Sequence, residues 1–294
     1  KGPHGFASLV RYGNGNITMH HNLFAYHMSR IPRVGDNITL DFVANVVAFW
    51  AKAGAGYSMP DEFSVHRVNV INNYYDPGHR TGNKAVFSAH FYGPSFINTH
   101  THLYFHGNMI DRAPHPRSRT PRPMNISREV YGTYIRSDKR FPLTTHPISV
   151  GGAKGAYKNV LYDAGASLVR DSVDIRVVDN VKKRTGKAIN SQNQVDSWPT
   201  LNSLPAPLDS DGDGIPDADE LEMHLDPSNP HDASRRGNNN HYTFLELYHH
   251  NLIRVSIFPL SKKRKKSNLM SLAKSVKAGT PYLFQGSYPD CIWD

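Results

Sequence analysis

The sequence predicts an all-β chain: a right-handed parallel β-helix, truncated at its N-terminus, followed by a small calcium-loop and helix module and a disordered basic tail. Three observations support this prediction. A strand-like unit with an asparagine recurs along residues 16–110, one amphipathic segment follows it, and an aspartate-rich loop comes after a proline-rich linker. Short β units that repeat roughly every 20 to 50 residues are typical of solenoids, because no unit buries its apolar face alone.

The repeated unit is an alternating apolar segment, an asparagine and two large apolar residues. It occurs around Asn22, Asn45, Asn73 and Asn108. Alternation indicates strands with one buried face. In a β-helix, asparagines at matching positions of successive coils would stack and hydrogen-bond the backbone of the turns. The alternative is four unrelated turn asparagines in a β-sandwich, which does not account for the shared flanking residues.

The first unit, residues 16–33, ends in Arg30-Ile-Pro-Arg33. Proline fixes its own φ angle, so this sequence sets a rigid, positively charged corner just past a strand. A cationic corner of this kind suits a sugar acid.

The rest of the first domain divides into loops and one helix. Residues 111–158 are polar and rich in Pro, Arg and His, so we expect long surface loops there. Residues 167–185 place Val173, Val177 and Val181 at intervals of four, with basic residues at the end and Gly186 as a stop. This pattern predicts one amphipathic helix, packed on the side or end of the solenoid.

The domain organisation follows from the linker prolines. We expect a β-helix domain with a C-terminal helix over residues 1–198, a linker at 199–208, a calcium-binding loop module at 209–250 and a basic, disordered tail at 251–294.

Composition bounds the function. A hydrophobic content of 38% is enough for a packed core, and no apolar run is long enough to cross a bilayer. The net charge is +9, but residues 251–294 hold eight Lys or Arg and two Asp, that is, +6 of it. That tail has no aromatic interleaving and no recognised nucleic-acid module around it. We therefore expect no nucleic-acid partner, no membrane segment and a monomer.

Residues 209–220 match a twelve-residue calcium loop. Oxygen-bearing side chains stand at positions 1, 3, 5, 9 and 12, and glycine stands at position 6. The predicted ligands are Asp209, Asp211, Asp213, the carbonyl of Ile215, Asp217 and Glu220. Such a set of hard oxygens suits calcium better than magnesium. The alternative is an acidic surface turn without metal.

The surroundings of the loop differ from those of a paired EF-hand, because the linker prolines forbid a preceding helix. The loop resembles the thrombospondin type 3 and dockerin kind, in which the loop leads into one helix, here residues 220–224. Residues 236–247 resemble a second such loop, with Arg, His and Leu at positions 1, 6 and 12. We expect this second half to keep the packing of Tyr242 and Leu245 but to bind metal poorly.

The first domain resembles the pectate lyases. The resemblance rests on His20-His21-Asn22 followed by Ser-Arg-Ile-Pro-Arg, and it continues through the segments LDFVANVVAFWAKAGAGYS, RVNVINNYYDPG, LYFHGNMID, RDSVDIRVVDNV and SWPTL, to about residue 200. It implies a secreted enzyme that cleaves polygalacturonate, an acidic polysaccharide, by calcium-assisted β-elimination.

The same resemblance assigns roles to individual residues. It makes Arg30 the base that removes the C5 proton of the sugar, although a guanidinium normally keeps its proton at neutral pH. We expect Arg33 to bind the substrate carboxylate and His4 and His21 to contribute to substrate binding. A structural role for each histidine is equally open.

Two alternatives remain at this stage. The chain could be a non-catalytic β-helical protein that binds or adheres to acidic glycans, or a lyase acting on another uronate polymer. The residues before Asn16 hold no Asp or Glu, whereas the family places its calcium-binding carboxylates on coils before this segment. We therefore expect this chain to be a weakly active or inactive fragment.

Overall fold

The structure is a computed structural model of the chain. It describes residues 5–257 apart from 12, 14, 52–53, 61–62, 78–84, 90–99, 112–120, 144–147, 149–150, 168, 202–204 and 238–241. The chain divides into two compact units, Lys1–Thr200 and Leu201–Asp294. The division falls inside the predicted linker, and the predicted tail beyond residue 257 lies outside the described residues.

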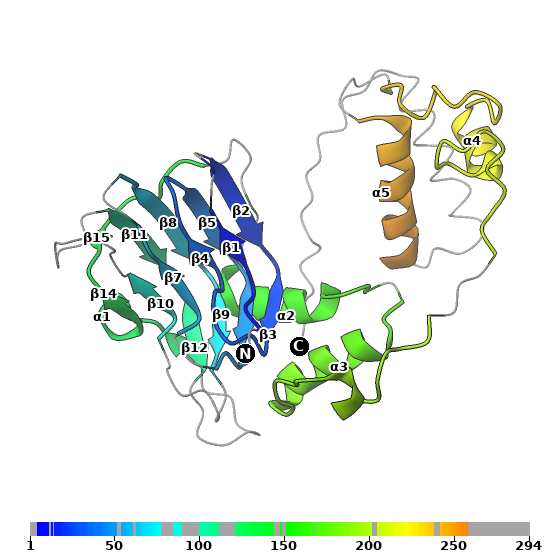
Figure 1. Cartoon of the computed structure of the whole chain (residues 1–294). Coiled ribbons are helices and arrows are strands. Elements are labelled where there is room, and N and C mark those ends of the chain that lie inside the picture. Colours follow the sequence, from blue (N-terminus) through cyan, green and yellow to red (C-terminus); the bar gives the residue numbers. More distant parts are fainter. Residues whose placement is uncertain are drawn as a thin grey trace. The chain divides into compact units, whose positions relative to one another are not determined.

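The first unit is a right-handed parallel β-helix, as predicted (Figure 1). The chain passes through three five-stranded sheets in turn, so each round forms one coil. Sheet A contains β1 (Leu9–Val10), β4 (Arg33–Val34), β7 (Gly56–Ser58), β10 (Phe87–Ala89) and β14 (Val130–Gly132). Sheet B contains β2 (Asn16–His20), β5 (Thr39–Val43), β8 (His66–Ile71), β11 (Thr101–His106) and β15 (Ile135–Arg136). Sheet C contains β3 (Leu23–Ala25), β6 (Val46–Ala48), β9 (Tyr74–Asp76), β12 (Met109–Asp111) and β13 (Pro121–Pro123).

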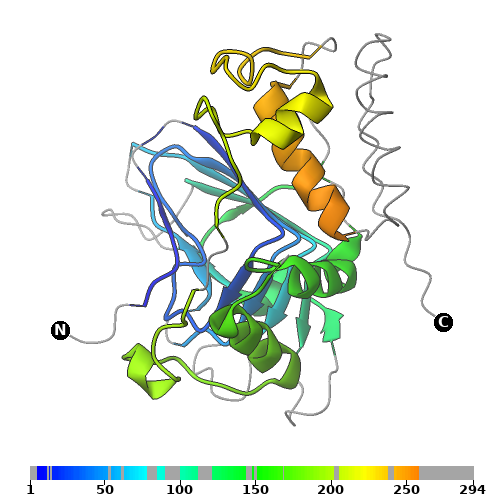
Figure 2. The same ribbon diagram turned by 90° about the vertical axis from the view of Figure 1, so that its right-hand side faces the viewer.

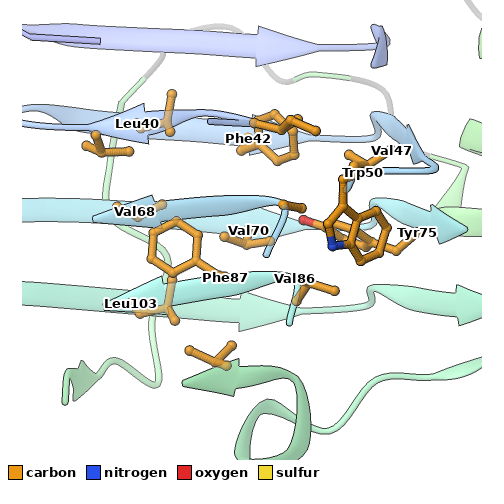
Figure 3. Close-up of a cluster of buried hydrophobic side chains, with 14 of the residues drawn as sticks. Leu40, Phe42, Val47, Trp50, Val68, Val70, Tyr75, Val86, Phe87 and Leu103 are labelled. Atoms are coloured by element: carbon orange, nitrogen blue, oxygen red, sulfur yellow. The ribbon is translucent and has the colours of Figure 1, made fainter. Parts of the chain in front are cut away.

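The strand register places like residues above one another. In sheet B, Leu40 lies opposite Val68, which lies opposite Leu103 in the next coil. All three side chains are fully buried. They pack with apolar side chains of the other two sheets and with Trp50 in the interior of the coils (Figure 3). The strands pair in parallel except β12 and β13, which run antiparallel.

The predicted asparagine ladder is present between sheets B and C. The side-chain amide of Asn22 donates to Asn45 Oδ1 at 3.0 Å, that of Asn45 to Asn73 Oδ1 at 3.1 Å, and that of Asn73 to Asn108 Oδ1 at 3.0 Å. Each acceptor oxygen also receives the backbone N–H of the asparagine one coil earlier. The ladder thus satisfies amides that the turn between two sheets leaves unpaired.

The expectation of long loops over residues 111–158 is wrong for much of the described part, and residues 112–120, 144–147 and 149–150 lie outside the described residues. This range includes β13–β15, the short helix α1 (Ile126–Glu129) and residues 152–158 of helix α2 (Gly152–Asp163). Helix α2 forms because Ala153, Ala156, Val160 and Leu161 share one buried face. Val160 packs against Val46 and Tyr74 of sheet C. Three glycines at its start conceal this face in the sequence.

Helix α3 (Ser172–Lys183) is the predicted amphipathic helix, and it packs with α2 and sheet C (Figure 2). It starts later than residue 167 because Asp171 caps it, accepting from the N–H groups of Val173 and Asp174 at 2.9 Å. It ends at Arg184, which takes a left-handed conformation, rather than at Gly186. The Arg184 side chain donates to Asp76 at 2.7 Å, and both are buried. A single-turn 3-10 helix, η1 (Gln192–Gln194), follows.

The described part of the second unit contains the helices α4 (Asp217–Met223) and α5 (Phe244–Ile257). Helix α4 begins directly after Pro216, earlier than residue 220, because proline is suited to a helix start. The predicted boundary at residue 250 falls inside α5, whose helical sequence continues with Leu252 and Ile253. Ile215, Leu225 and Ala233 form the core, against which Leu245 and Tyr248 of α5 pack. None of the described helices in either unit combines the length and apolarity that a bilayer span requires.

Candidate functional site

The first candidate site surrounds the predicted base, Arg30. This residue stands just before β4 in a left-handed conformation, with φ of 64°. Its carbonyl accepts the N–H of Ser8 at 2.8 Å, and Ile31 N–H donates to Ala55 at 2.8 Å. The neighbouring coils on both sides thus hold the backbone in place. The Arg30 guanidinium lies 4.0 Å from the centre of the Phe6 ring. A strained residue held this firmly points to a functional role.

Arg33 lies on the outer face of sheet A. Its strand neighbour Val34 is fully buried, and alternate residues of a strand point to opposite faces. In the register of sheet A, Arg33 lies opposite Leu9 on one side and Tyr57 on the other. The Arg33 guanidinium is 5.7 Å from the centre of the Tyr57 ring. Continuing across the sheet, Tyr57 pairs with Ser88, and Ser88 with Tyr131.

Three polar atoms in this short segment are buried without a hydrogen-bond partner among the described residues. They are Ser29 Oγ, Arg30 Nε and Arg33 Nε. Unsatisfied buried donors are costly and uncommon in folded proteins. Guanidinium groups hold carboxylates through two parallel N–H donors, and aromatic faces accept the C–H face of a sugar ring. The arrangement therefore suits an acidic sugar on the outer face of sheet A.

Of the two predicted histidines, His21 does not join this site. His21 occupies the turn between β2 and β3, the corner of sheets B and C, whereas Arg33 belongs to sheet A. Its Nδ1 is 2.8 Å from Nδ1 of His20. Burial and His20 lower the pKa of His21, and Asp163 of α2 opposes this shift. Sequence proximity to Arg30 suggested a shared site, but one coil carries the chain across three separate faces. His4 lies outside the described residues.

The second candidate site is the acidic loop of the second unit. Asp209, Asp211 and Asp213 bring carboxylate oxygens within 4.8 Å of one another. Backbone N–H groups of the loop shape it: Gly212 and Gly214 donate to Asp209 at 2.8 and 3.1 Å, and Ile215 donates to Asp213 at 2.9 Å. Gly214 has φ of 97°, which only glycine adopts readily. The Ile215 side chain is fully buried.

A second group of carboxylates shares Asp213 with the first. Asp213, Glu220 and Asp232 also bring oxygens within 4.8 Å of one another. Glu220 is fully buried, and neither of its carboxylate oxygens has a hydrogen-bond partner. Burial, followed by the negative charges of Asp211 and Asp213, raises the pKa of Glu220 to about 7. Concentrated, unpaired negative charge of this kind fits a divalent cation with oxygen ligands.

One predicted ligand stands apart from these groups. Both carboxylate oxygens of Asp217 accept hydrogen bonds from Ser210, from its N–H and its Oγ, each at 2.7 Å. Asp232, by contrast, escaped the sequence prediction because it lies beyond the twelve-residue pattern. Among the described residues, both groups of possible metal ligands belong to this second unit, so the described part of the β-helix supplies none beside Arg30.

The predicted second loop keeps only half of its packing role. Leu245 packs in the core beside Ile215, as expected. The expectation for Tyr242 is wrong, because 44% of this residue is exposed. Its neighbour Thr243 forms an isolated bridge with Arg236. Residues 238–241 of this segment lie outside the described residues.

The fold and the residues around Arg30 define a parallel β-helix protein that carries cationic and aromatic side chains on the outer face of sheet A. Comparison with known proteins relates the chain to particular members of that class. It is 30% identical over 258 residues to the probable pectate lyase C of Aspergillus terreus, covering 85% of this chain and 56% of that protein. It is 30% identical over 246 residues to the protein of the same name from Neosartorya fischeri, covering 82% and 54%.

The similarity supports the resemblance to the pectate lyase family seen in the sequence. The chain spans about half the length of the curated relatives it matches. No family model matches it.

Proposed function

We propose that this chain is part of a secreted pectate lyase that cleaves polygalacturonate by β-elimination. The observation that carries the proposal is the pair of arginines at β4, Arg30 just before the strand and Arg33 in it, whose buried Nε atoms have no hydrogen-bond partner among the described residues. The relatives named as probable pectate lyases support the same substrate class. Secretion rests on the family resemblance.

The proposed chemistry assigns one role to each arginine. Arg33 holds the carboxylate of a galacturonate unit, and its charge stabilises the negative charge that develops next to C5 in the transition state. Arg30, in its neutral form, takes the C5 proton. The electron pair left on C5 forms the C4–C5 double bond, the C4–O4 bond breaks, and O4 leaves with the preceding sugar and gains a proton. The described residues beside these arginines do not assemble a calcium site, so the step is derived from the arginines alone.

The test is to incubate the full chain with polygalacturonate and to measure the formation of unsaturated uronides by their ultraviolet absorbance. Arg30→Ala is expected to abolish product formation, and Arg33→Ala to raise KM by about tenfold or more, since it loses a charged hydrogen bond to the substrate. Arg136→Ala is the matched control, because Arg136 is exposed and lies in sheet B. Absence of product from the unaltered chain, with or without calcium, contradicts the proposal.

The Arg30→Ala variant also separates the lyase from a glycan-binding protein. A lyase loses cleavage in this variant while retention on immobilised polygalacturonate changes little. A binding protein forms no product in either form and loses retention. Product from another uronate polymer but none from polygalacturonate would change the substrate class and keep the chemistry.

We also propose calcium as a cofactor, bound by the second unit through the loop ligands Asp209, Asp211, Asp213, Ile215, Asp217 and Glu220. The support is the set of buried carboxylate oxygens without hydrogen-bond partners at Asp211, Asp213 and Glu220. Glycine in left-handed conformations at Gly212 and Gly214 allows the sharp turn that such a loop needs. Titration of the metal-free chain with calcium and with magnesium, followed by calorimetry, tests this: calcium is expected to bind more tightly.

A further inference from the structure

Asp232 lies outside the calcium loop and is nevertheless buried beside it. Only 2% of this residue is exposed, and its Oδ1 atom has no hydrogen-bond partner. Its Oδ2 atom accepts the N–H of Asp226 at 2.9 Å, which fixes the orientation of the carboxylate. An oxygen of Asp232 lies within 4.8 Å of oxygens of both Asp213 and Glu220.

Within the part of the chain that the structure describes, these three carboxylates have no cationic partner. None of the ion pairs of the described residues involves Asp213, Glu220 or Asp232. Two buried carboxylates facing a third repel one another strongly unless a positive charge lies between them. Oxygens within 4.8 Å of one another can all reach one calcium ion, whose ligand distances are roughly 2.3–2.6 Å.

The ninth position of the loop leaves room for an outside ligand. Asp217, which occupies it, turns both oxygens toward Ser210. A carboxylate from elsewhere in the unit can therefore complete the coordination that the loop begins. Asp232 lies beside Asp213 and Glu220 and can supply this carboxylate.

The segment around Asp232 is also the anchor of helix α5. The N–H of Leu245 donates to the carbonyl of Ala233 at 3.0 Å, and the N–H of Phe244 to the carbonyl of Arg235 at 3.1 Å. A cation held by Glu220 on α4 and by Asp232 would thus join the loop to the segment on which α5 begins.

We propose that Asp232 is a calcium ligand supplied from outside the twelve-residue loop, together with Asp213 and Glu220, and that calcium thereby fastens the start of α5 to the loop. This inference rests on the proposed calcium site and adds a ligand and a structural consequence to it. In this arrangement calcium stabilises the packing of the loop with the start of α5, and its effect is not confined to the loop itself.

The first test is calcium binding by the full chain, measured by calorimetry after removal of metal with a chelator. Asp232→Asn preserves the size of the side chain and an acceptor for Asp226 while removing the charge. It is expected to weaken calcium binding by about tenfold or more, since charged ligands set the affinity of such sites. Glu222→Gln is the matched control, expected to change binding less than about threefold because Glu222 is exposed on α4 and belongs to neither group of carboxylates.

The second test uses the unaltered chain, so it holds even if the variant misfolds. Hydrogen exchange with and without calcium is expected to show slower exchange at the amides of Asp226 and Leu245 as well as within residues 209–220. Protection confined to residues 209–220 overturns the inference. So does an Asp232→Asn variant that binds calcium as tightly as the Glu222→Gln variant. If the unaltered chain binds no calcium, the proposed cofactor fails as well.

Discussion

The side-chain amide of Asn45 donates to the side-chain oxygen of Asn73, 3.1 Å away in the next coil, and both residues are fully buried. Asn73 in turn donates to Asn108 and to the carbonyl of Phe42. Each asparagine therefore satisfies backbone and side-chain groups of two coils at once. The ladder fixes the axial spacing at the corner between sheets B and C.

Removing one member from the middle of this ladder should be costly. Asn73→Ala removes the acceptor of the Asn45 N–H and of one hydrogen of the Asn45 amide, whose nitrogen still donates to the Met19 carbonyl. It also removes the side-chain donor to the Phe42 carbonyl. We expect a loss of roughly 3 kcal/mol in the free energy of unfolding, because each unsatisfied group costs about 1–3 kcal/mol and some relaxation occurs. Urea unfolding measures it. Asn22→Ala at the exposed end of the ladder is the control, and an equal loss in both variants would contradict the argument.

The buried ion pair of Arg184 gives a second prediction. Arg184 is 2% exposed, and its partners Asp76 and Asp111 are fully buried, with nitrogen–oxygen distances of 2.7 and 3.6 Å. Arg184→Met removes the cation that these two buried carboxylates share. We expect about 3–5 kcal/mol of destabilisation in urea unfolding, as is usual when one partner of a buried pair is removed.

The matched control for Arg184 is its exposed neighbour. Lys183 pairs with Asp179 at 2.9 Å one helical turn away, with 67% of the lysine side chain exposed. Lys183→Met is expected to cost less than about 0.5 kcal/mol, since exposed pairs contribute little. Similar losses in the two variants would show that α3 docks through its apolar face alone.

The pH dependence of the first unit follows from His27. Burial lowers the pKa of His27 below its ordinary value of 6.5, although a backbone hydrogen bond to Gly5 opposes the shift. The unfolded chain therefore binds more protons than the folded chain as pH falls through 6.5. Stability should rise with pH across this window and be lost on acidification. Urea unfolding at about pH 8 and about pH 5.5 measures the difference. His27→Gln should reduce it, and an unchanged difference contradicts the assignment.

The ladder and the acidic loop could be predicted from the sequence because each has a local, repeated signature. Asn22, Asn45, Asn73 and Asn108 stand in the same flanking pattern, and Asp209 to Glu220 follow fixed offsets. Helix α2 could not be predicted, because its start is rich in glycine. Its apolar face is also stabilised only by packing against sheet C, which the local sequence does not show. Tertiary packing overrides weak local propensity in such cases.

The candidate sites show the same division. The Arg-x-Pro sequence identifies Arg30 and Arg33. The position of Tyr57 beside Arg33 could not be predicted, because it depends on the strand register, which pairs Arg33 with a residue one coil away. His21 is close to Arg30 in sequence and lies on another corner of the coil. Asp232 has no spacing signal, because its position beside Glu220 depends on the turn at residues 226–232.

Metal removal gives the last prediction, through Glu220. Without metal, burial of the carboxylate, followed by the negative charges of Asp211, Asp213, Asp232 and Asp217, raises the pKa of Glu220. Glu220→Gln removes one of these repelling charges while keeping the size of the side chain. The metal-free variant should therefore unfold at a higher temperature than the metal-free unaltered chain, with the transition of the second unit followed by calorimetry.

Calcium should reverse that order. At a calcium concentration about a hundredfold above the dissociation constant, the unaltered chain gains roughly 2.7 kcal/mol of stability by mass action. The Glu220→Gln variant loses a buried ligand and should gain little, so its unfolding temperature stays nearly constant when calcium is added or chelated. Leu221, the exposed neighbour of Glu220 on α4, provides the control: Leu221→Gln should leave the response to calcium intact. A Glu220→Gln variant that still gains stability from calcium would remove Glu220 from the set of ligands, because a group that does not contact the ion cannot alter the free energy of its binding to this extent.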